Sequence, residues 1–363
     1  MTRVQGVVRS AVVVLALWAA SLSGARAERF DFVALGDTAY NGAKDEPVYA
    51  RLIEQINQAR PAFSIHVGDV WGGSDCQEPD HRRILDGFGR FDHPVIYTPG
   101  DNEWTDCVDP AVLAAWERLE ARQAQSGDEA LLAGFRQVGS RATRPGRWAL
   151  ESLARIRQLY FSTPRSLGQR TLVLERQPAV SAQHRQTVEN ARWRQAGVVF
   201  ATVHVVGSMN GLSVSDPQAA AEAVSRNQAN VDWIQGSFEL AERSNAPALV
   251  LAMHASFFEH APPRGKTRGR AVLAGRAGPY ALVAQAIQEG AARFDKPVLL
   301  VHGDDHEFMI DRPFLAVEGE DKPVQGSKLT RLQVYGAPEI RAVRISVDTE
   351  SPTVFSFAPM SAD

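Results

Sequence analysis

Carboxylate and imidazole side chains follow five separate apolar runs of the 363-residue sequence. Each run is typical of a strand buried on both faces, and a glycine before several of the acids lets the chain turn as it leaves the sheet. Ionised carboxylates brought together would repel one another, whereas one or two divalent cations would bind them together with neutral imidazoles. The pattern therefore predicts a metal centre at one edge of a sheet, built from Asp37, Asp69, Asp101, His254, Asp304 and His306.

The order of these segments resembles the calcineurin-like metallophosphoesterase superfamily, which includes the purple acid phosphatases. The resemblance extends from about residue 30 to residue 306, which is most of the chain. It is carried by Gly36-Asp37, Gly68-Asp69, Gly100-Asp101-Asn102-Glu103, His254 and Gly303-Asp304-Asp305-His306. The resemblance implies an α/β fold, a mixed-sheet β-sandwich flanked by helices. It also implies that a hydroxide bridging two metal ions attacks phosphorus in line.

The resemblance also implies how the ligands are divided between two divalent cations. One cation would be held by Asp37, Asp69 and His306. The other would be held by Asp69, Asp101, His254 and Asp304, so that Asp69 bridges the two. At Asp101 and Asp304 this chain has carboxylates where the family has amide or imidazole ligands, which favours Mn, Fe, Mg or Ca over Zn.

Other positions depart from the family pattern in ways that affect chemistry. Ala39 replaces a histidine ligand of the first cation, with the phenol of Tyr40 nearby. Asn102 replaces the histidine that assists the leaving group, while Glu103 keeps the acid that holds it. An amide can donate a hydrogen bond but cannot supply a proton as imidazolium does. Either another group is the acid, or the substrate needs none, or catalysis has been lost; the candidate acids are His66, His204 and His302.

The leading hypothesis is an exported metal-dependent phosphoesterase, with Asn102 and Glu103 at the catalytic positions. Phosphomonoesters, phosphodiesters and nucleotides all fit as substrates, so the expected partner is a phosphorylated small molecule or a nucleotide. The alternative is a catalytically degenerate protein on the same scaffold, which binds a metal or a ligand without turnover. The altered residues Ala39 and Asn102 are the reason to consider it.

Several residues outside the motifs are candidates for contact with a substrate. Ser208 and Asn210 lie in a polar turn that follows the strand predicted over residues 197–207. Arg141, Arg144 and Arg147 could meet a phosphate, as could the basic loop within residues 257–270. A solvated loop is the alternative for both basic segments.

Residues 1–27 have the pattern of a secretory signal peptide. Arg3 and Arg9 precede an apolar stretch that begins at Ala11 and ends near Leu22, and residues 25–27 form an Ala-x-Ala cleavage site. The apolar stretch is short for a bilayer span, which favours a cleaved leader over an uncleaved signal anchor. We therefore expect a periplasmic or secreted protein with a single metallophosphoesterase-like domain over residues 28–363.

The chain has two cysteines, Cys76 and Cys107. They follow Asp69 by seven residues and Asp101 by six, so both would leave the same rim if those acids end neighbouring strands. An oxidising compartment lets such a pair form a disulfide, with two free thiols as the alternative. We expect the disulfide.

The mature chain is mildly acidic. Cleavage after residue 27 removes three of the 39 Lys and Arg residues and none of the 42 Asp and Glu residues, which changes the net charge from −3 to −6. The sequence has no tract of five or more basic residues, so a surface for duplex nucleic acid is not indicated. After signal cleavage no further apolar stretch is long enough to span a membrane. The oligomeric state is left open.

Alternating strands and helices predict right-handed crossovers and a largely parallel core. Strands are expected to end at the motif residues, and helices are expected over residues 46–60, 81–88, 219–243 and 280–294. Residues 110–160, approximately, carry no motif and are predicted to form a helical insertion. Further strands are predicted at 170–174 and 197–207 and, as closing strands of a second sheet, at 328–333, 342–347 and 353–357.

Overall fold

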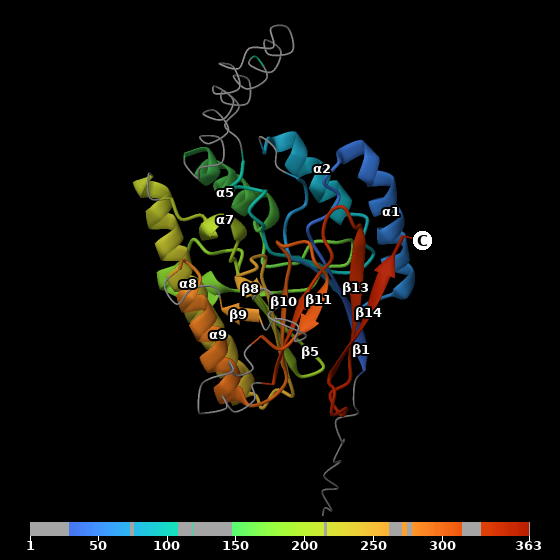
Figure 1. The fold of residues 1–363 in the computed structure, drawn as a ribbon, viewed down its shortest axis with the longest axis vertical. Coiled ribbons are helices and arrows are strands. Elements are labelled where there is room, and N and C mark those ends of the chain that lie inside the picture. Colours follow the sequence, from blue (N-terminus) through green and yellow to red (C-terminus); the bar gives the residue numbers. More distant parts are fainter. Residues whose placement is uncertain are drawn as a thin grey trace, which may run out of the picture.

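Two β-sheets packed face to face form the centre of the molecule (Figure 1). The computed structural model describes residues 29–72, 76–107, 118, 147–213, 216–260, 271–273, 278–313 and 328–362. The predicted signal peptide and the loop arginines Arg141 and Arg144 lie outside these residues, as do residues 261–270 of the basic loop. None of the helices formed by the described residues is long and apolar enough to cross a membrane.

The first sheet contains the N-terminal strands and the last two strands of the chain. Its order is β14 (Phe355–Ser361), β13 (Arg341–Val347), β1 (Phe30–Leu35), β2 (Ser64–His66) and β3 (Val95–Tyr97). The strands β1, β2 and β3 are parallel to one another, so their carboxyl ends lie at one edge. The strand β13 is antiparallel to β1 and β14 is antiparallel to β13.

The second sheet has a parallel centre with antiparallel edges. Its order is β11 (Met309–Asp311), β12 (Leu329–Gln333), β10 (Val298–His302), β7 (Leu249–Ala252), β6 (Val198–Thr202), β5 (Ala191–Gln195) and β4 (Glu175–Arg176). The four strands from β12 to β6 are parallel. A separate two-stranded ribbon consists of β8 (Phe258–His260) and β9 (Ala271–Leu273).

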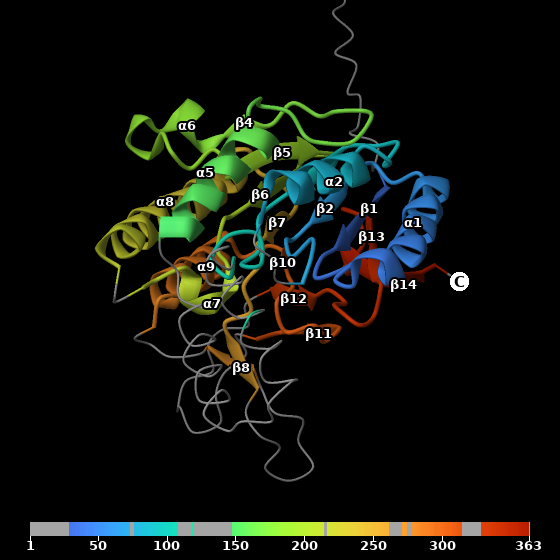
Figure 2. The ribbon, with the colours of Figure 1, turned by 90° about the horizontal axis from the view of Figure 1, so that it is seen from above.

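Helices cover the outer face of each sheet (Figure 2). The helices α1 (Gly42–Ala59), α2 (Glu78–Phe88) and α5 (Arg147–Tyr160) share a hydrophobic cluster with the first sheet. The helices α8 (Pro217–Arg243) and α9 (Ala281–Phe294) share another cluster with the second sheet. Short helical segments are α6 (Gln177–Val180), η1 (Ala182–His184) and α7 (Gly207–Asn210).

Aromatic side chains fill the space between the two sheets. Phe32 of β1 stacks on Phe63, with 5.3 Å between ring centroids, and meets Phe200 of β6 edge to face at 5.4 Å. These three rings are buried, and burial of each stabilises the fold by roughly 1.5 to 3 kcal/mol. The inner faces of the sheets thus form one core, and the chain has four layers in the order helix, sheet, sheet, helix.

The predicted fold class, a mixed-sheet sandwich flanked by helices, is confirmed. Two details differ. The three C-terminal strands do not all close the second sheet as predicted, because β12 joins β10 there while β13 and β14 extend the first sheet beyond β1. Residues 170–174 form no strand: Val173 makes one isolated bridge to Arg165, across a turn where Gly168 has a φ of 88°.

Of the predicted helical insertion, residues 147–160 form α5, and most of residues 110–146 lie outside the described chain.

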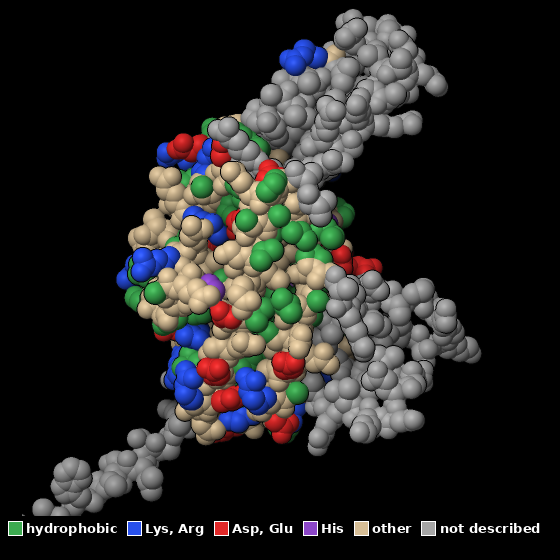
Figure 3. All heavy atoms as spheres, turned by 90° about the vertical axis from the view of Figure 1, so that its left-hand side faces the viewer, with side chains coloured by type: hydrophobic (Ala, Val, Ile, Leu, Met, Phe, Trp, Pro, Cys, Tyr) green, Lys and Arg blue, Asp and Glu red, His purple; other side chains and the backbone are tan. Residues whose placement is uncertain are grey.

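Positive and negative side chains are interspersed on the face of the molecule that Figure 3 shows. Hydrophobic side chains gather in the middle of this face, and charged side chains of both signs gather at its lower end. Among the residues drawn in colour, neither positive nor negative charge dominates this face.

Candidate metal centre

The motif residues come together where strands of both sheets end. Asp37, Asp69 and Asp101 follow β1, β2 and β3 of the first sheet. His254 follows β7 and Asp304 follows β10 of the second sheet. The expectation that a single sheet edge gathers them is therefore wrong: two parallel centres, packed face to face, present their carboxyl ends to the same side.

Glycines in the turns make the close approach of these acids possible. A Cβ atom on Gly100 would lie 2.1 Å from Oδ1 of Asp69, and one on Gly303 would lie 1.9 Å from Oδ2 of Asp37. Both distances are far below van der Waals contact, so the neighbouring carboxylates leave no room for a side chain. Asp37 and Asp69 themselves adopt left-handed conformations, with φ of 50° and 53°. Backbone outliers of this kind cluster at functional sites.

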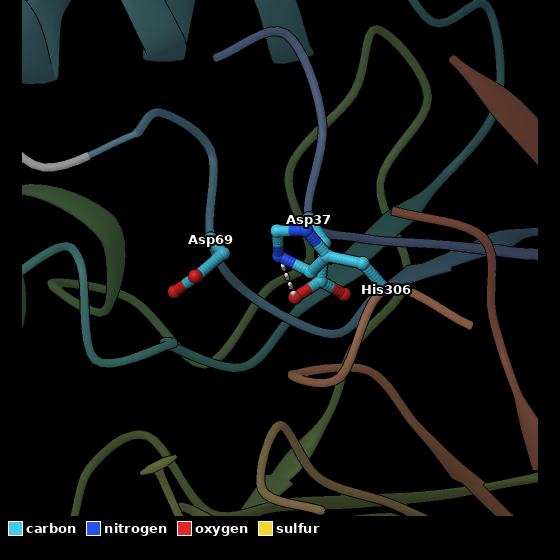
Figure 4. A group of neighbouring side chains, drawn as sticks. All are labelled: Asp37, Asp69 and His306. Carbon is cyan, nitrogen blue, oxygen red and sulfur yellow. Dashed lines mark ion pairs between the residues drawn. The ribbon is translucent and has the colours of Figure 1, made fainter. Parts of the chain in front are cut away.

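A first group of possible ligands consists of Asp37, Asp69 and His306 (Figure 4). Nε2 of His306 lies 3.6 Å from Oδ1 of Asp37, and its Nδ1 is 2.9 Å from the carbonyl oxygen of Ala337. A donated Nδ1–H would leave the lone pair of Nε2 directed at the acids. Oδ2 of Asp37 is buried and has no hydrogen-bond partner among the described residues. A buried carboxylate oxygen without a donor is costly, and a cation would satisfy it.

Tyr40 completes this first group. Its hydroxyl donates to Oδ2 of Asp69 at 2.6 Å and lies 3.1 Å from Nε2 of His306. The phenol oxygen therefore lies within hydrogen-bond distance of two of the three residues of this group.

A second group consists of Asp69, Asp101 and His254, so Asp69 belongs to both. Nε2 of His254 lies 2.7 Å from Oδ1 of Asp101 and 3.4 Å from Oδ1 of Asp69. Nδ1 of His254 is 2.9 Å from the carbonyl oxygen of Val67, which fixes the ring as in the first group. Asp304 lies at the edge of this group, with Oδ1 3.7 Å from Nε2 of His254 and Oδ2 accepting from the backbone N–H of Ser256.

Burial changes the protonation of the cluster. It raises the pKa of Asp37 to about 7 and that of Asp304 to about 6, and it raises the pKa of Asp69 well above its usual range. For Asp101 burial, the largest cause, acts in the same direction, but the hydrogen bond and the charge of His254, together with the hydrogen bond from Ser208, outweigh it and lower the pKa to about 2. Burial disfavours the charged form of His254, yet Asp69 and Asp101 raise its pKa well above the usual range. Without a cation, the acids and His254 thus retain protons that a bound cation would displace.

We expect cation affinity to weaken as the pH falls from 8 to 5. A cation competes with protons on Asp37 and Asp304, so binding weakens once the pH drops below their folded-state pKa values of about 7 and about 6. Each pH unit below a pKa costs about tenfold, so Asp37 alone should account for roughly a hundredfold. Calorimetric titration with Mn²⁺ in buffers of different ionisation enthalpy would measure both the affinity and the protons released. An affinity that is constant over this range would contradict the protonation described above.

Tyr40→Phe is expected to weaken the cation of the first group about tenfold and to affect the second less, through the shared Asp69 alone. Removal of the hydroxyl takes away an oxygen that lies within hydrogen-bond distance of two of the three ligands, and partners of this kind change metal affinity by about 10- to 100-fold. Tyr49→Phe, on a buried tyrosine of α1, is the matched control. Equal affinities in both variants would exclude Tyr40 from the group.

Of the predicted catalytic pair, Asn102 contacts Asp69 and Glu103 contacts the residue that follows it. Nδ2 of Asn102 donates to Oδ2 of Asp69 at 2.7 Å and to the carbonyl oxygen of Trp71 at 2.9 Å. Glu103 is fully buried, and its Oε1 accepts from the backbone N–H of Val70 and from the hydroxyl of Tyr97. Glu103 therefore holds the loop after Asp69 from the interior of the protein.

The three candidate acids lie in the interior. His66, His204 and His302 are all fully buried. Burial lowers the pKa of His66 to about 3, and Nδ1 of His204 is paired with Oε1 of Glu189 at 2.7 Å. None of the three imidazoles is exposed to solvent.

Of the two candidate substrate contacts, only Ser208 faces solvent. Its hydroxyl lies 2.9 Å from Oδ2 of Asp101 and 2.8 Å from Oδ2 of Asp106. Asn210 is buried, and its side chain accepts from Arg226 at 2.6 Å. Neither Asp106 nor Arg226 could be recognised from the sequence, because each lies outside a motif: Arg226 is one of several polar residues in a long helix.

The predicted disulfide between Cys76 and Cys107 is confirmed. Both residues are buried, with a sequence separation of 31 and 5.7 Å between their Cα atoms. The bridge joins the loop that follows Asp69 to the loop that follows Asp101. Two ligand-bearing loops are therefore covalently linked.

No family model and no curated protein matches the sequence. Several solved structures are similar in fold. The structure of PhoD is 10% identical, with a TM-score of 0.49 over 92% of this chain and 68% of that one. The GAP50 anchor of the inner membrane complex of Plasmodium is 9% identical, with a TM-score of 0.45 over 92% and 89%.

A dimetal phosphatase from Danio rerio is also 9% identical, with a TM-score of 0.46 over 92% of this chain and 99% of that one. At these identities and scores, the likeness describes an arrangement of strands and helices and carries no information about what the chain binds.

Proposed function

We propose that this chain is an exported, metal-dependent phosphoesterase whose centre holds two divalent cations. One observation supports this function most directly: two groups of ligands share Asp69, and both imidazoles are turned so that Nε2 faces the acids. Asp37, Asp69 and His306 would hold the first cation with Tyr40 beside them. Asp69, Asp101 and His254 would hold the second, with Asp304 at its edge.

The donor set fits hard cations better than zinc. Carboxylates are the majority of both groups, and the phenol oxygen of Tyr40 lies beside the first, which favours Mn, Fe, Mg or Ca. When bound, two such ions lower the pKa of a coordinated water and neutralise charge on phosphoryl oxygens. The residues of the chain orient the ligands: Asn102 holds Asp69, Glu103 holds the loop after it, and Ser208 holds Asp101 at the rim.

A phosphorylated small molecule or a nucleotide is the proposed substrate. Ser208 is exposed beside Asp101, so its hydroxyl is the described polar group best placed to meet a bound phosphate ester. The Cys76–Cys107 disulfide is consistent with export to an oxidising compartment, periplasmic or extracellular.

A binding protein without turnover is the second candidate. The observation that favours it is the position of the proton donors: the Asn102 amide is engaged by Asp69 and Trp71, and His66, His204 and His302 are buried. One assay separates the candidates. Chelator-treated protein would be reloaded with Mn²⁺, Fe²⁺, Mg²⁺, Ca²⁺ and Zn²⁺ in turn and tested on an aryl phosphomonoester and an aryl phosphodiester.

Turnover that requires one of the first four ions would support the phosphoesterase. Measurable cation binding without turnover on either ester would support the binding protein. Protein without cation binding would contradict the phosphoesterase and, for the alternative, would leave only a protein that binds another ligand.

A further inference from the structure

The segment α7 packs directly on two acids of the metal centre. A Cβ atom on Gly207 would lie 2.6 Å from Oδ1 of Asp304 and 2.7 Å from Oδ2 of Asp101. The next residue, Ser208, hydrogen-bonds to the same Oδ2 of Asp101 at 2.9 Å. Oδ1 of Asp101 faces His254 instead. One oxygen of the Asp101 carboxylate thus faces His254 of the second ligand group, and the other faces α7.

Its backbone has an unfavourable conformation. Ser208, Met209 and Asn210 have φ values of 45°, 59° and 53°, and Gly211 continues at 69°. Left-handed backbone is unfavourable for residues with a Cβ atom, and three in succession require outside support. Met209 is exposed, so its own side-chain packing contributes little to that support.

The support comes from a buried guanidinium. Arg226 of α8 is 1% exposed, and its Nη1 and Nη2 donate to Oδ1 and to the carbonyl oxygen of Asn210 at 2.6 Å and 2.7 Å. Its other hydrogen bonds to described residues go to the carbonyl oxygen of His204 at 3.1 Å and to the carboxylate of Glu222. A planar guanidinium can make such a set of bonds at fixed angles, which an ammonium cannot.

Two further contacts hold α7 against the centre. The hydroxyl of Tyr280 accepts from the backbone N–H of Asn210 and donates to the carbonyl oxygen of Val206, both at 3.0 Å. The guanidinium of Arg226 also lies over the ring of Trp104, 5.0 Å from its centroid, and Trp104 belongs to the loop that begins at Asp101. Arg226 therefore joins the two loops that meet at Asp101.

We propose that Arg226 is a positioning residue for the second cation: it holds the left-handed segment 208–210 so that the Ser208 hydroxyl orients Asp101. This role rests on the two-cation centre proposed above. It predicts an effect on one cation only, because Ser208 and Gly207 contact Asp101 and Asp304 of the second group, whereas Tyr40 and His306 lie in the first.

Stepwise Mn²⁺ binding to the full-length protein, measured by calorimetry and equilibrium dialysis, tests this role. Tyr40→Phe identifies which binding step belongs to the first group. Ser208→Ala and Arg226→Gln are each expected to weaken the second step about 10- to 100-fold and to leave the first within twofold. The double variant should be no weaker than Arg226→Gln alone, since Arg226 acts through Ser208. Arg226→Lys should recover little, because the ammonium lacks the planar set of donors.

Arg243→Gln is the control, since this arginine lies on the same helix and pairs at the surface with Glu239. If Arg226→Gln does not fold, the affinity of the second step in Ser208→Ala and Tyr280→Phe tests the role instead. Each of these variants removes a single hydroxyl oxygen, and that of Ser208 is exposed. Three results would overturn the role of Arg226. The first is an unchanged affinity of the second step in Ser208→Ala, and the second is an equal loss of affinity in both steps. The third is a double variant whose loss of affinity is the product of the two single losses. Wild-type protein that binds no Mn²⁺ would overturn both this role and the proposed function.

Discussion

Asp69→Asn is expected to abolish binding of both cations. Asp69 belongs to both ligand groups, and its two oxygens also receive hydrogen bonds from Tyr40 and Asn102. An amide has one oxygen in place of two and carries no charge to balance a cation. Metal bound per protein should therefore fall from about two to near zero. Turnover should fall by roughly 10³-fold or more, because cations contribute several kcal/mol of transition-state stabilisation.

Asp304→Asn provides the contrast. Asp304 lies at the edge of the second group, so the substitution should weaken binding of the second cation and leave binding of the first unchanged. Asp305→Asn, one residue further along and exposed, is the matched control on the same loop. Elemental analysis of the three purified variants measures the difference. Equal metal content in wild type and Asp69→Asn would show that Asp69 is not the shared ligand.

Replacing both cysteines with serine is expected to lower stability and cation affinity together. The bridge closes a loop of about 31 residues, and a loop of this length restricts the unfolded chain by roughly 3 to 4 kcal/mol. Because the bridge also ties the loops after Asp69 and Asp101, its loss should loosen the second ligand group beyond the effect on unfolding. Urea denaturation with and without Mn²⁺ separates the two effects.

The difference in unfolding free energy between wild type and the Cys76→Ser/Cys107→Ser variant should be larger with Mn²⁺ than with chelator. Bound Mn²⁺ stabilises the folded state according to its affinity, and the variant should bind it more weakly. Thiol titration of denatured, unreduced protein should find no free thiol. Two free thiols would exclude the bridge, and identical differences in unfolding free energy in the two conditions would exclude its link to the centre.

The sequence was informative where chemistry and strand pattern coincide. Gly36-Asp37 and Gly68-Asp69 follow short apolar runs, and the residues after such runs meet wherever parallel strands end together. The disulfide could be predicted for the same reason, since Cys76 and Cys107 follow neighbouring strands at similar distances.

Pairing between distant segments could not be predicted. Periodicity marks a strand but does not say which sheet it joins, so the division of the ligands between two sheets and the place of β12 beside β10 were missed. Contacts made by side chains without a motif were missed as well. Arg226 lies in the middle of α8, and its link to Asn210 depends on how that helix packs against the second sheet.

The position of bound Mn²⁺ in a crystal of the protein tests the two-cation centre most directly. Anomalous diffraction should give two peaks, one among Asp37, Asp69 and His306 and the other among Asp69, Asp101 and His254, with Asp69 in contact with both. One peak, or peaks at which Asp69 is not a shared ligand, would contradict the centre described here.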